Sequence, residues 1–364
     1  WRPELIGEMA AHIGADLHAL GIHQGLSPLL DVARDYRWGR VEETCGEDPY
    51  LVGTMGTAYV QGLQGEGVHA TLKHFVGYPA SRAGRNHAPI SMGRRELSDV
   101  MLPPFEMAVR EGGAKSVMNS YCDIDGVPAG ASRWLLTELL RERWGFTGTV
   151  VSDYWSVNFL TSTHRIAQDE AAAAALSIRA GIDIELPDMG SFAAISEAIE
   201  RGLLTVEDVD RAALRALTQK AELGLLDAEP EIAGGDAPDR DLDSAENRAV
   251  ARRIADESIV LLSNDGTLPR GAGLGKVAVV GPVWTDLRSF MGCYAFPNHV
   301  LSRFPGKQTG LEIRSLDEVL PGALDGDLSF AGGCGFLGGT DEELYEAVEL
   351  AASADLAIVT VGDI

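Results

Sequence analysis

The chain has 364 residues, of which 45% are hydrophobic and 23% are charged, and its formal net charge is −24 with a pI of about 4.6. This composition is typical of a globular protein, and the length predicts two domains. A surface this acidic repels phosphate backbones and anionic lipids, which argues against nucleic acid and acidic membranes as partners. No apolar run in the sequence is long enough to span a bilayer.

The cysteines are scattered along the chain. They are Cys45, Cys122, Cys293 and Cys334. Their spacing fits neither a zinc site nor a disulfide scaffold, and it indicates free thiols in a reducing compartment. A cytoplasmic location is therefore slightly favoured over a secreted one. The sequence opens at Trp1, and we expect the natural N-terminus to lie before it, so export stays open.

Helical and strand patterns alternate along the first two thirds of the chain. Apolar residues at 6, 9, 13, 17 and 20 step by three and four, which predicts an amphipathic helix, and an apolar segment follows near 26–32. Further helices are predicted at 48–63, 96–110, 132–144 and 168–180, with helical segments continuing to 223. Strands are predicted at 70–75, 116–121, 149–153 and 182–186.

This alternation predicts parallel pairing of the strands and right-handed crossovers between them. An α/β fold of the (β/α)8-barrel type is the best fit. About five strands are predicted where such a barrel needs eight. Either further strands precede Trp1, so that the barrel domain is N-terminally incomplete, or the predicted number of strands is wrong.

Residues 226–246 differ in composition from both flanking regions. They are acidic, rich in Pro and Gly and poor in apolar residues, which predicts an interdomain linker. Residues 1–225 then form the barrel-type domain, and residues 247–364 form the first part of an α/β sandwich domain. This second region has a predicted helix at 247–257 and buried strands at 276–280 and 356–361.

Polar side chains stand at the C-terminal ends of three predicted strands, where a parallel barrel carries its working residues. Lys73 and His74 end one strand, Tyr121 ends the next, and Asp153 ends the third, followed by two aromatic residues. A carboxylate beside aromatic rings suits a sugar site. Taken singly, Asp153 is equally well explained as a helix cap, and Lys73 and His74 as structural residues. Together they favour a pocket.

Four segments make this interpretation more specific. They are SPLLDVARDYRWGRVEETCGEDPYLVG at 27–53, LKHFVGYPASRAGRNHAP, GTVVSDYWSV and AGIDIELP, in this order. They resemble motifs of glycoside hydrolase family 3 in sequence and spacing, with Tyr36 where the first motif of the family has Pro. The resemblance covers nearly the whole chain. It implies a retaining β-glycosidase with a barrel domain followed by an α/β sandwich domain.

The resemblance also implies a role for each matching residue. Asp153 corresponds to the catalytic nucleophile that forms a covalent glycosyl-enzyme. Arg40, Lys73, His74 and Arg85 correspond to groups that hydrogen-bond the hydroxyls of the sugar in the −1 subsite. Long cationic donors suit hydroxyl oxygens and help to keep a nearby Asp ionised.

Three further residues match positions around the nucleophile. Tyr121 corresponds to a tyrosine beside it, Met118 lies on the pocket wall, and Tyr154 stands where many members have Trp. Other interpretations stay open for some polar residues. Arg40 could pair with Glu42, Glu43, Glu47 or Asp48, and Asp183 and Glu185 could either line the barrel end or form internal salt bridges. The sequence reveals no role for His87, which we expect to be structural.

Hydrolysis with retention needs a second carboxyl group, roughly 5–5.5 Å from the first. The barrel motifs offer none. In most of the family the general acid/base is a Glu in a loop after a strand like that at 356–361, so we expect it after Ile364. A family Asp that binds the outer hydroxyls would precede Trp1. We therefore expect the 364-residue piece alone to be weakly active or inactive, and poorly soluble.

We expect an exo-acting β-glucosidase first and a β-xylosidase second. A non-catalytic carbohydrate-binding relative and an aldolase that uses Lys73 as a Schiff base are the remaining alternatives. Residues 76–86 contain no Asp-His pair, which argues against an N-acetylglucosaminidase. We expect no cofactor and no metal, since no calcium-type loop is present. The expected partner is a β-linked oligosaccharide or glycoside, and a homo-oligomer or a complementing chain segment stays open.

Overall fold

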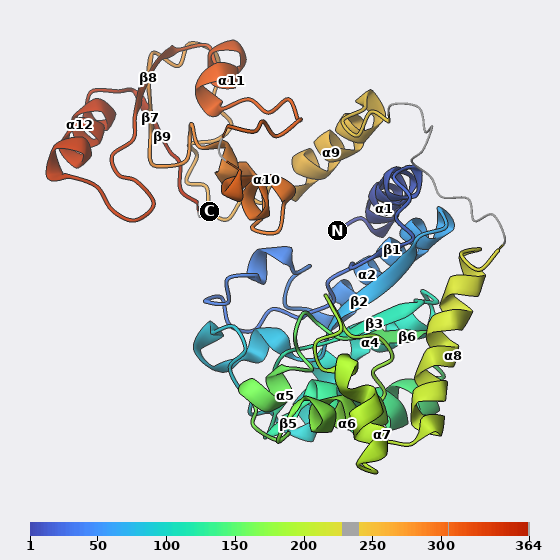
Figure 1. Ribbon diagram of the computed structural model, residues 1–364. Coiled ribbons are helices and arrows are strands. Elements are labelled where there is room, and N and C mark those ends of the chain that lie inside the picture. The colour runs from blue at the N-terminus through green and yellow to red at the C-terminus, as the bar shows by residue number, and fades with distance from the viewer. Residues whose placement is uncertain (228–239, 305, 363–364) are drawn as a thin grey trace. The chain divides into compact units, whose positions relative to one another are not determined.

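The computed structural model describes residues 1–227, 240–304 and 306–362. The chain divides into two compact units, Trp1–Glu257 and Ser258–Ile364. Figure 1 shows the first unit from blue to yellow and the second in orange and red. In the described part of the chain, no helix combines the length and the apolar character that crossing a membrane requires.

A parallel sheet forms the centre of the first unit. Its strands are β1 (Gln24–Gly25), β2 (His69–Phe75), β3 (Ser116–Asn119) and β6 (Thr149–Val151), hydrogen-bonded in this order. The strands follow one another in the sheet as they do in the sequence, with helical segments between them, as in an α/β barrel. Figure 1 shows β2, β3 and β6 side by side. The fold is TIM-barrel-like, as predicted.

The sheet is covered by helices. The helices of the first unit are α1 (Pro3–Ala19), α2 (Pro49–Gly65), α3 (Arg94–Glu96), α4 (Pro103–Arg110), α5 (Phe159–Ser162), α6 (Glu170–Ala180), α7 (Ile195–Glu200), α8 (Val206–Glu222) and α9 (Ala245–Ser258). Helix α2 begins where Asp48 accepts a hydrogen bond from the Leu51 N–H and Pro49 occupies the first turn. A side chain on Gly62 would collide with the Gly7 carbonyl, so glycine allows α1 and α2 to pack closely.

Three predicted elements differ in the structure. The helix expected at 96–110 is interrupted by a π-helical stretch at Leu97–Met101, and α4 starts at Pro103 because proline offers no N–H to a preceding turn. The helix expected at 132–144 is a π-helix at Trp134–Arg143. The strand expected at 182–186 is reduced to one bridge between Ile184 and Val151.

A short antiparallel hairpin that was not predicted follows β3. It consists of β4 (Asp123–Ile124) and β5 (Val127–Pro128), joined by a turn in which Asp125 and Gly126 have positive φ. The apolar segment near 26–32 follows β1 and contributes one parallel bridge, from Leu29 to Lys73.

The second unit has its own parallel sheet in the order β8 (Asp327–Ala331), β7 (Lys276–Val280), β9 (Leu356–Val359). The two predicted strands are confirmed in position, although the second one ends at Val359. Strand β7 is buried as predicted, whereas the side chains of β9 alternate between half-buried and exposed. Strand β8 was not predicted, although its polar and apolar residues alternate as in a half-buried strand. The helices of this unit are α10 (Phe296–His299), α11 (Leu316–Ala323) and α12 (Asp341–Ala352).

Most of the predicted linker, residues 228–239, lies outside the described residues. Helix α9 belongs to the first unit, whereas the sequence placed the start of the second domain at residue 247. The reason is polar contact with α1. The guanidinium of Arg253 lies 2.8 and 2.9 Å from the Glu8 carboxylate, and the Asn247 amide donates to Asp16 at 2.9 Å.

Candidate active site

Asp153 follows β6 and is only 7% exposed. Its Oδ1 accepts a hydrogen bond from the Tyr154 N–H at 2.8 Å, and its own N–H donates to Asn119 Oδ1 at 3.4 Å. Its Oδ2 is buried and accepts no hydrogen bond from the described part of the chain. Helix α5 begins beyond Asn158, so Asp153 is not a helix cap. A buried carboxylate oxygen without a partner is costly, which indicates a site built for a reacting group.

His74 is the penultimate residue of β2 and is 1% exposed. Its Nδ1 lies 2.7 Å from Asp31 Oδ2, and its Nε2 lies 2.9 Å from a guanidinium nitrogen of Arg40. A guanidinium only donates, so Nε2 accepts and the proton sits on Nδ1, which donates to Asp31. Burial lowers the pKa of His74 to about 3, in agreement with a neutral ring. The 3.8 Å between Nε2 and Asp153 Oδ2 is therefore a contact of a neutral imidazole rather than an ion pair.

Arg40 links this histidine to a carboxylate. The guanidinium pairs with Glu43, with one nitrogen–oxygen distance of 2.9 Å, while also donating to His74. The ion pair with Glu43 was one of the open alternatives for Arg40. In the structure, Arg40 makes both the ion pair with Glu43 and the hydrogen bond to His74, since the planar guanidinium can serve two partners at once.

Lys73 precedes His74 and lies among the same charges. Burial is the largest cause that lowers the pKa of Lys73, and the charge of Arg40 lowers it further. The carboxylates of Glu43, Asp153 and Asp31 raise it. The structure therefore brings Arg40, Lys73 and Asp153 together, as the sequence predicted. Charges of both signs therefore lie together in a buried site, where each favours the ionised form of its neighbour of opposite sign.

Burial also dominates the titration of the two aspartates. It raises the pKa of Asp153, and among the effects that oppose it are hydrogen bonds from the Tyr154 N–H and the Tyr121 side chain. Burial raises the pKa of Asp31 to about 8, with Arg40 and the His74 N–H opposing the rise. Both carboxyl groups are thus held in a poorly solvated environment.

The other predicted site residues occupy different positions. Met118 is buried in β3, paired with Val151. Tyr121 reaches Asp153 through its side chain. Tyr154 is 40% exposed. Arg85 is exposed on the loop after β2, and in the described residues its side chain has no hydrogen-bond or ion-pair partner.

The sequence analysis missed two residues that shape the cluster. Asp31 holds His74, and Asn119 accepts from the Asp153 N–H. Asp31 carries a signal in retrospect, because it is a lone charge within the apolar run LLDVA and such a charge must find a buried partner. Asn119 carries none, because an Asn at a strand end also suits a turn.

Asp183 and Glu185 have structural roles. Asp183 lies 2.6 Å from Arg141 and 2.9 Å from Arg215, and it accepts from the Val150 N–H. Glu185 accepts from the N–H groups of two residues in the following turn. Of the two open interpretations, the internal salt bridge applies to Asp183. Among the described residues, no group of three His, Cys, Asp or Glu side chains is arranged to hold a metal ion.

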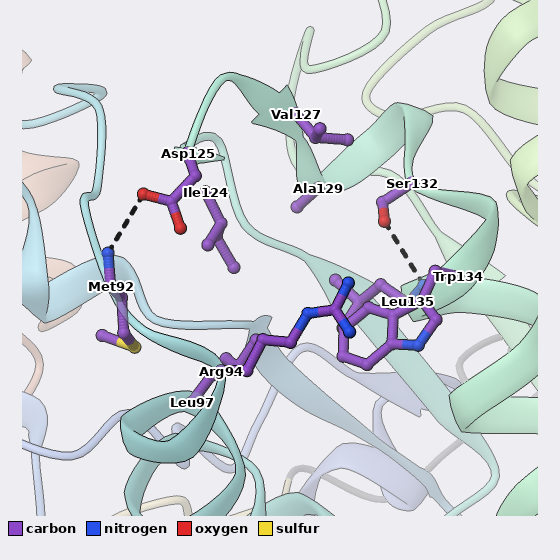
Figure 2. A pocket seen from close by; sticks show the side chains of 10 residues that line it. All are labelled: Met92, Arg94, Leu97, Ile124, Asp125, Val127, Ala129, Ser132, Trp134 and Leu135. Atoms are coloured by element: carbon purple, nitrogen blue, oxygen red, sulfur yellow. Dashed lines mark hydrogen bonds between the residues drawn. The ribbon is translucent and has the colours of Figure 1, made fainter.

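A pocket of about 270 Å³ lies at the β4–β5 hairpin. Figure 2 shows its lining, with the Asp125 carboxylate bonded to the Met92 N–H and the Ser132 hydroxyl bonded to the Leu135 N–H. Apolar side chains provide most of the surface. The pocket contains none of the predicted site residues, so the candidate active site is the cluster around Asp153.

Residues 1–219 match the family described as glycosyl hydrolase family 3 N terminal domain. The chain belongs to this family. It is 36% identical to a β-xylosidase from Formosa agariphila, covering 100% of this chain and 52% of that protein. It is 35% identical to a β-glucosidase from Rhizobium radiobacter, covering 78% of this chain and 32% of that protein.

Solved structures of family 3 agree with this assignment. A β-glucosidase involved in saponin metabolism from intestinal bacteria superposes with a TM-score of 0.92 at 30% identity, covering 100% of this chain and 52% of that one. A β-glucosidase from Listeria innocua in complex with glucose superposes with a TM-score of 0.85 at 30% identity, covering 100% of this chain and 49% of that one. The chain thus spans about half the length of these relatives.

Proposed function

We propose that the whole protein is an exo-acting, retaining β-glycosidase that releases terminal β-D-glucosyl residues, with Asp153 as its nucleophile. One observation carries the proposal. Asp153 Oδ2 is buried at the end of β6 without a hydrogen-bond partner in the described residues, whereas Oδ1 is held by the Tyr154 N–H. The carboxylate is therefore oriented with one oxygen held and the other available for attack.

The chemistry follows from this orientation. In the first step, Oδ2 bonds to the anomeric carbon while the glycosidic C–O bond breaks, and the electron pair goes to the leaving oxygen. That oxygen takes a proton from a general acid. In the second step, water attacks the anomeric carbon, the acid/base removes its proton, and Asp153 is released.

The surrounding side chains are suited to binding the sugar. Lys73 and Arg40 supply N–H donors, and their positive charges favour the ionised form of Asp153. The His74 ring is neutral and is locked on both sides. We propose that these groups bind the hydroxyls in the −1 subsite, with Arg85, Met118 and Tyr121 around them. Tyr154 and its neighbour Trp155 are exposed aromatic rings next to the nucleophile.

β-Xylosidase is the second candidate. The reason is that the match to the Formosa agariphila β-xylosidase covers all of this chain and 52% of that protein. The side chains that we propose to bind the −1 sugar would contact hydroxyls that glucose and xylose share. They therefore do not distinguish the two substrates.

An aldolase that uses Lys73 as a Schiff base is less well supported. Such a lysine must be neutral to attack a carbonyl. The pKa of Lys73 is lowered by burial, but three carboxylates, Asp31, Glu43 and Asp153, oppose this.

The test is covalent labelling of the whole protein with a 2-deoxy-2-fluoro-β-glucoside that bears a good leaving group, followed by peptide mass mapping. We expect the sugar on Asp153, because an activated leaving group reduces the need for the acid. Asp153→Asn should abolish labelling, and Asp188→Asn, which changes an exposed carboxyl, should not. Repetition with the xylose analogue compares the two sugars. A folded protein that accepts neither label would point to the binding-only alternative.

A further inference from the structure

His87 packs against the tyrosine that contacts the nucleophile. Its ring centroid lies 4.3 Å from that of Tyr121 and 5.1 Å from that of Phe159, and the Tyr121 and Phe159 rings are 5.4 Å apart. Of the rings that surround Tyr121, His87 is the closest in the described part of the chain, since the Tyr78 ring is 5.8 Å away. The three rings restrict the side-chain torsions of Tyr121.

The backbone of Tyr121 is held separately. Its carbonyl oxygen accepts a hydrogen bond from His164 Nε2 at 2.9 Å. A carbonyl only accepts, so His164 carries its proton on this nitrogen. With the backbone held in this way, the direction of the Tyr121 hydroxyl depends on the packing of its ring. That hydroxyl is hydrogen-bonded to Asp153.

His87 is itself held in one orientation. Its φ of 63° is in the left-handed region, which His tolerates better than most non-glycine residues. The Asn86 amide nitrogen lies 3.3 Å from His87 Nε2, and since an amide nitrogen only donates, Nε2 accepts. Asn86 accepts in turn from the Tyr78 hydroxyl, and the Tyr78 ring packs on His74. The loop is thus tied to the Asp153 cluster through two separate rings.

We propose that His87 is a positioning residue, whose ring holds Tyr121 so that the tyrosine hydroxyl stays directed at the Asp153 carboxylate. This inference rests on the proposed function of Asp153 as nucleophile, and it assigns a role to a residue that the sequence left without one. The His87 ring is neutral in this arrangement. Burial, and then the neighbouring His164, lower its pKa, which keeps the accepting form.

The consequence is a change in the titration of Asp153. The Tyr121 hydrogen bond lowers the pKa of Asp153, so loss of that bond raises it and moves the acid limb of nucleophilic attack to higher pH. The titratable or charged groups that face Asp153 in the described residues are Arg40, Lys73, His74, Tyr78, Tyr121 and Cys122. Of these, only Tyr121 has its ring against His87.

The experiment measures the rate of fluoroglucoside labelling against pH in the whole protein. His87→Asn tolerates the left-handed backbone and removes the ring, while His87→Phe keeps a ring. We expect His87→Asn to move the acid limb to higher pH. Tyr121→Phe, which removes the hydroxyl itself, should move it in the same direction. At pH values below the pKa of Asp153, the labelling rate should fall about tenfold for each pH unit by which the acid limb moves. The double variant should move the limb no further than Tyr121→Phe alone. His87→Phe should stay near the natural profile. His18→Asn, an exposed histidine on α1, is the matched control and should show no change.

Three results would overturn the proposal: an unchanged profile in His87→Asn, a double variant whose effect is the sum of the two single effects, or an His87→Phe protein that behaves like His87→Asn. If the natural protein takes no label, the proposed function fails separately. The Asp153 titration can then be followed by carbon NMR of its carboxyl group in the same variants. A higher pKa in His87→Asn supports the positioning role, and an unchanged one rejects it.

Discussion

The Nδ1 of His74 donates to Asp31 across 2.7 Å, and this bond determines which face of the imidazole is left for the site. With the proton on Nδ1, Nε2 can only accept, and Arg40 supplies the donor at 2.9 Å. The same Asp31 oxygen also accepts from the His74 N–H at 3.2 Å. Asp31 therefore holds both the backbone and the ring of a residue that we place in the −1 subsite.

Asp31 makes stability depend on pH. Its folded-state pKa is about 8 against an ordinary value of 3.8, so the unfolded chain releases this proton more readily than the folded protein. Stability linked to Asp31 is therefore full below about pH 4 and is lost as the pH rises toward 8. Asp31→Asn keeps an acceptor for His74 without a titrating group. We expect thermal unfolding of this variant to change less between pH 5 and pH 8 than that of the natural protein. An equal change in both would contradict the raised pKa, and Asp188→Asn is the control.

Arg40 should not be replaceable by lysine. Its guanidinium serves Glu43 and His74 at once, which an ammonium group cannot do with the same geometry. Loss of one charge-assisted hydrogen bond corresponds to about 1.5–3 kcal/mol, or roughly a 10- to 100-fold lower kcat/KM on an aryl β-glucoside. Steady-state kinetics of Arg40→Lys test this. Arg95→Lys, which changes an exposed arginine paired with Asp99, should retain the natural rate.

Trp155 combines exposure with backbone strain. It is 50% exposed at φ 60°, a conformation that is unfavourable for a bulky side chain. Trp155→Gly should therefore raise the free energy of unfolding by about 1 kcal/mol relative to Trp155→Ala, because glycine adopts this φ without strain. Urea unfolding of the two variants measures the difference. Equal stability would mean that the backbone is not strained at this position.

The same two variants test whether Trp155 contacts the leaving group. Both should lose activity on a β-linked disaccharide, whose leaving group is a sugar that can stack on the indole. Both should keep their activity on β-glucosyl fluoride, whose leaving group is a single ion. A parallel loss on both substrates would instead indicate that Trp155 supports the fold of the loop.

The Asp183 ion pairs should matter for stability and not for chemistry. Asp183→Ala leaves the buried Arg141 without its carboxylate partner, and such a loss costs roughly 3–5 kcal/mol. We expect a large decrease in the free energy of unfolding measured with urea, while the fraction that stays folded still takes the fluoroglucoside label on Asp153. Loss of labelling in folded protein would give Asp183 a role in the site.

Much of the fold could be predicted from the sequence. Strands β6 (TVV) and β7 (KVAVV) are rich in β-branched residues, as a buried parallel strand requires, whereas β2 and β3 are buried although they also carry polar residues. The breaks in the helices were less visible, because the π-helical stretch Leu97–Met101 is short and its two buried residues, Leu97 and Met101, are four apart, as on one face of an α-helix. Strand β8 contains no apolar run like the one that marked β9, and only the alternation of its polar and apolar residues indicates a strand.

The sequence by itself determined the family and the strand ends that carry Lys73, His74, Tyr121 and Asp153, because these depend on local patterns and their order. Only the tertiary structure decided which partners these residues have. The choice of Glu43 for Arg40, of Asp31 for His74 and of His87 for Tyr121 depends on contacts between segments that are far apart in the chain or that turn back on one another. A buried polar group must find a partner, but several candidates satisfy that demand in the sequence, and the packing of the folded chain selects one.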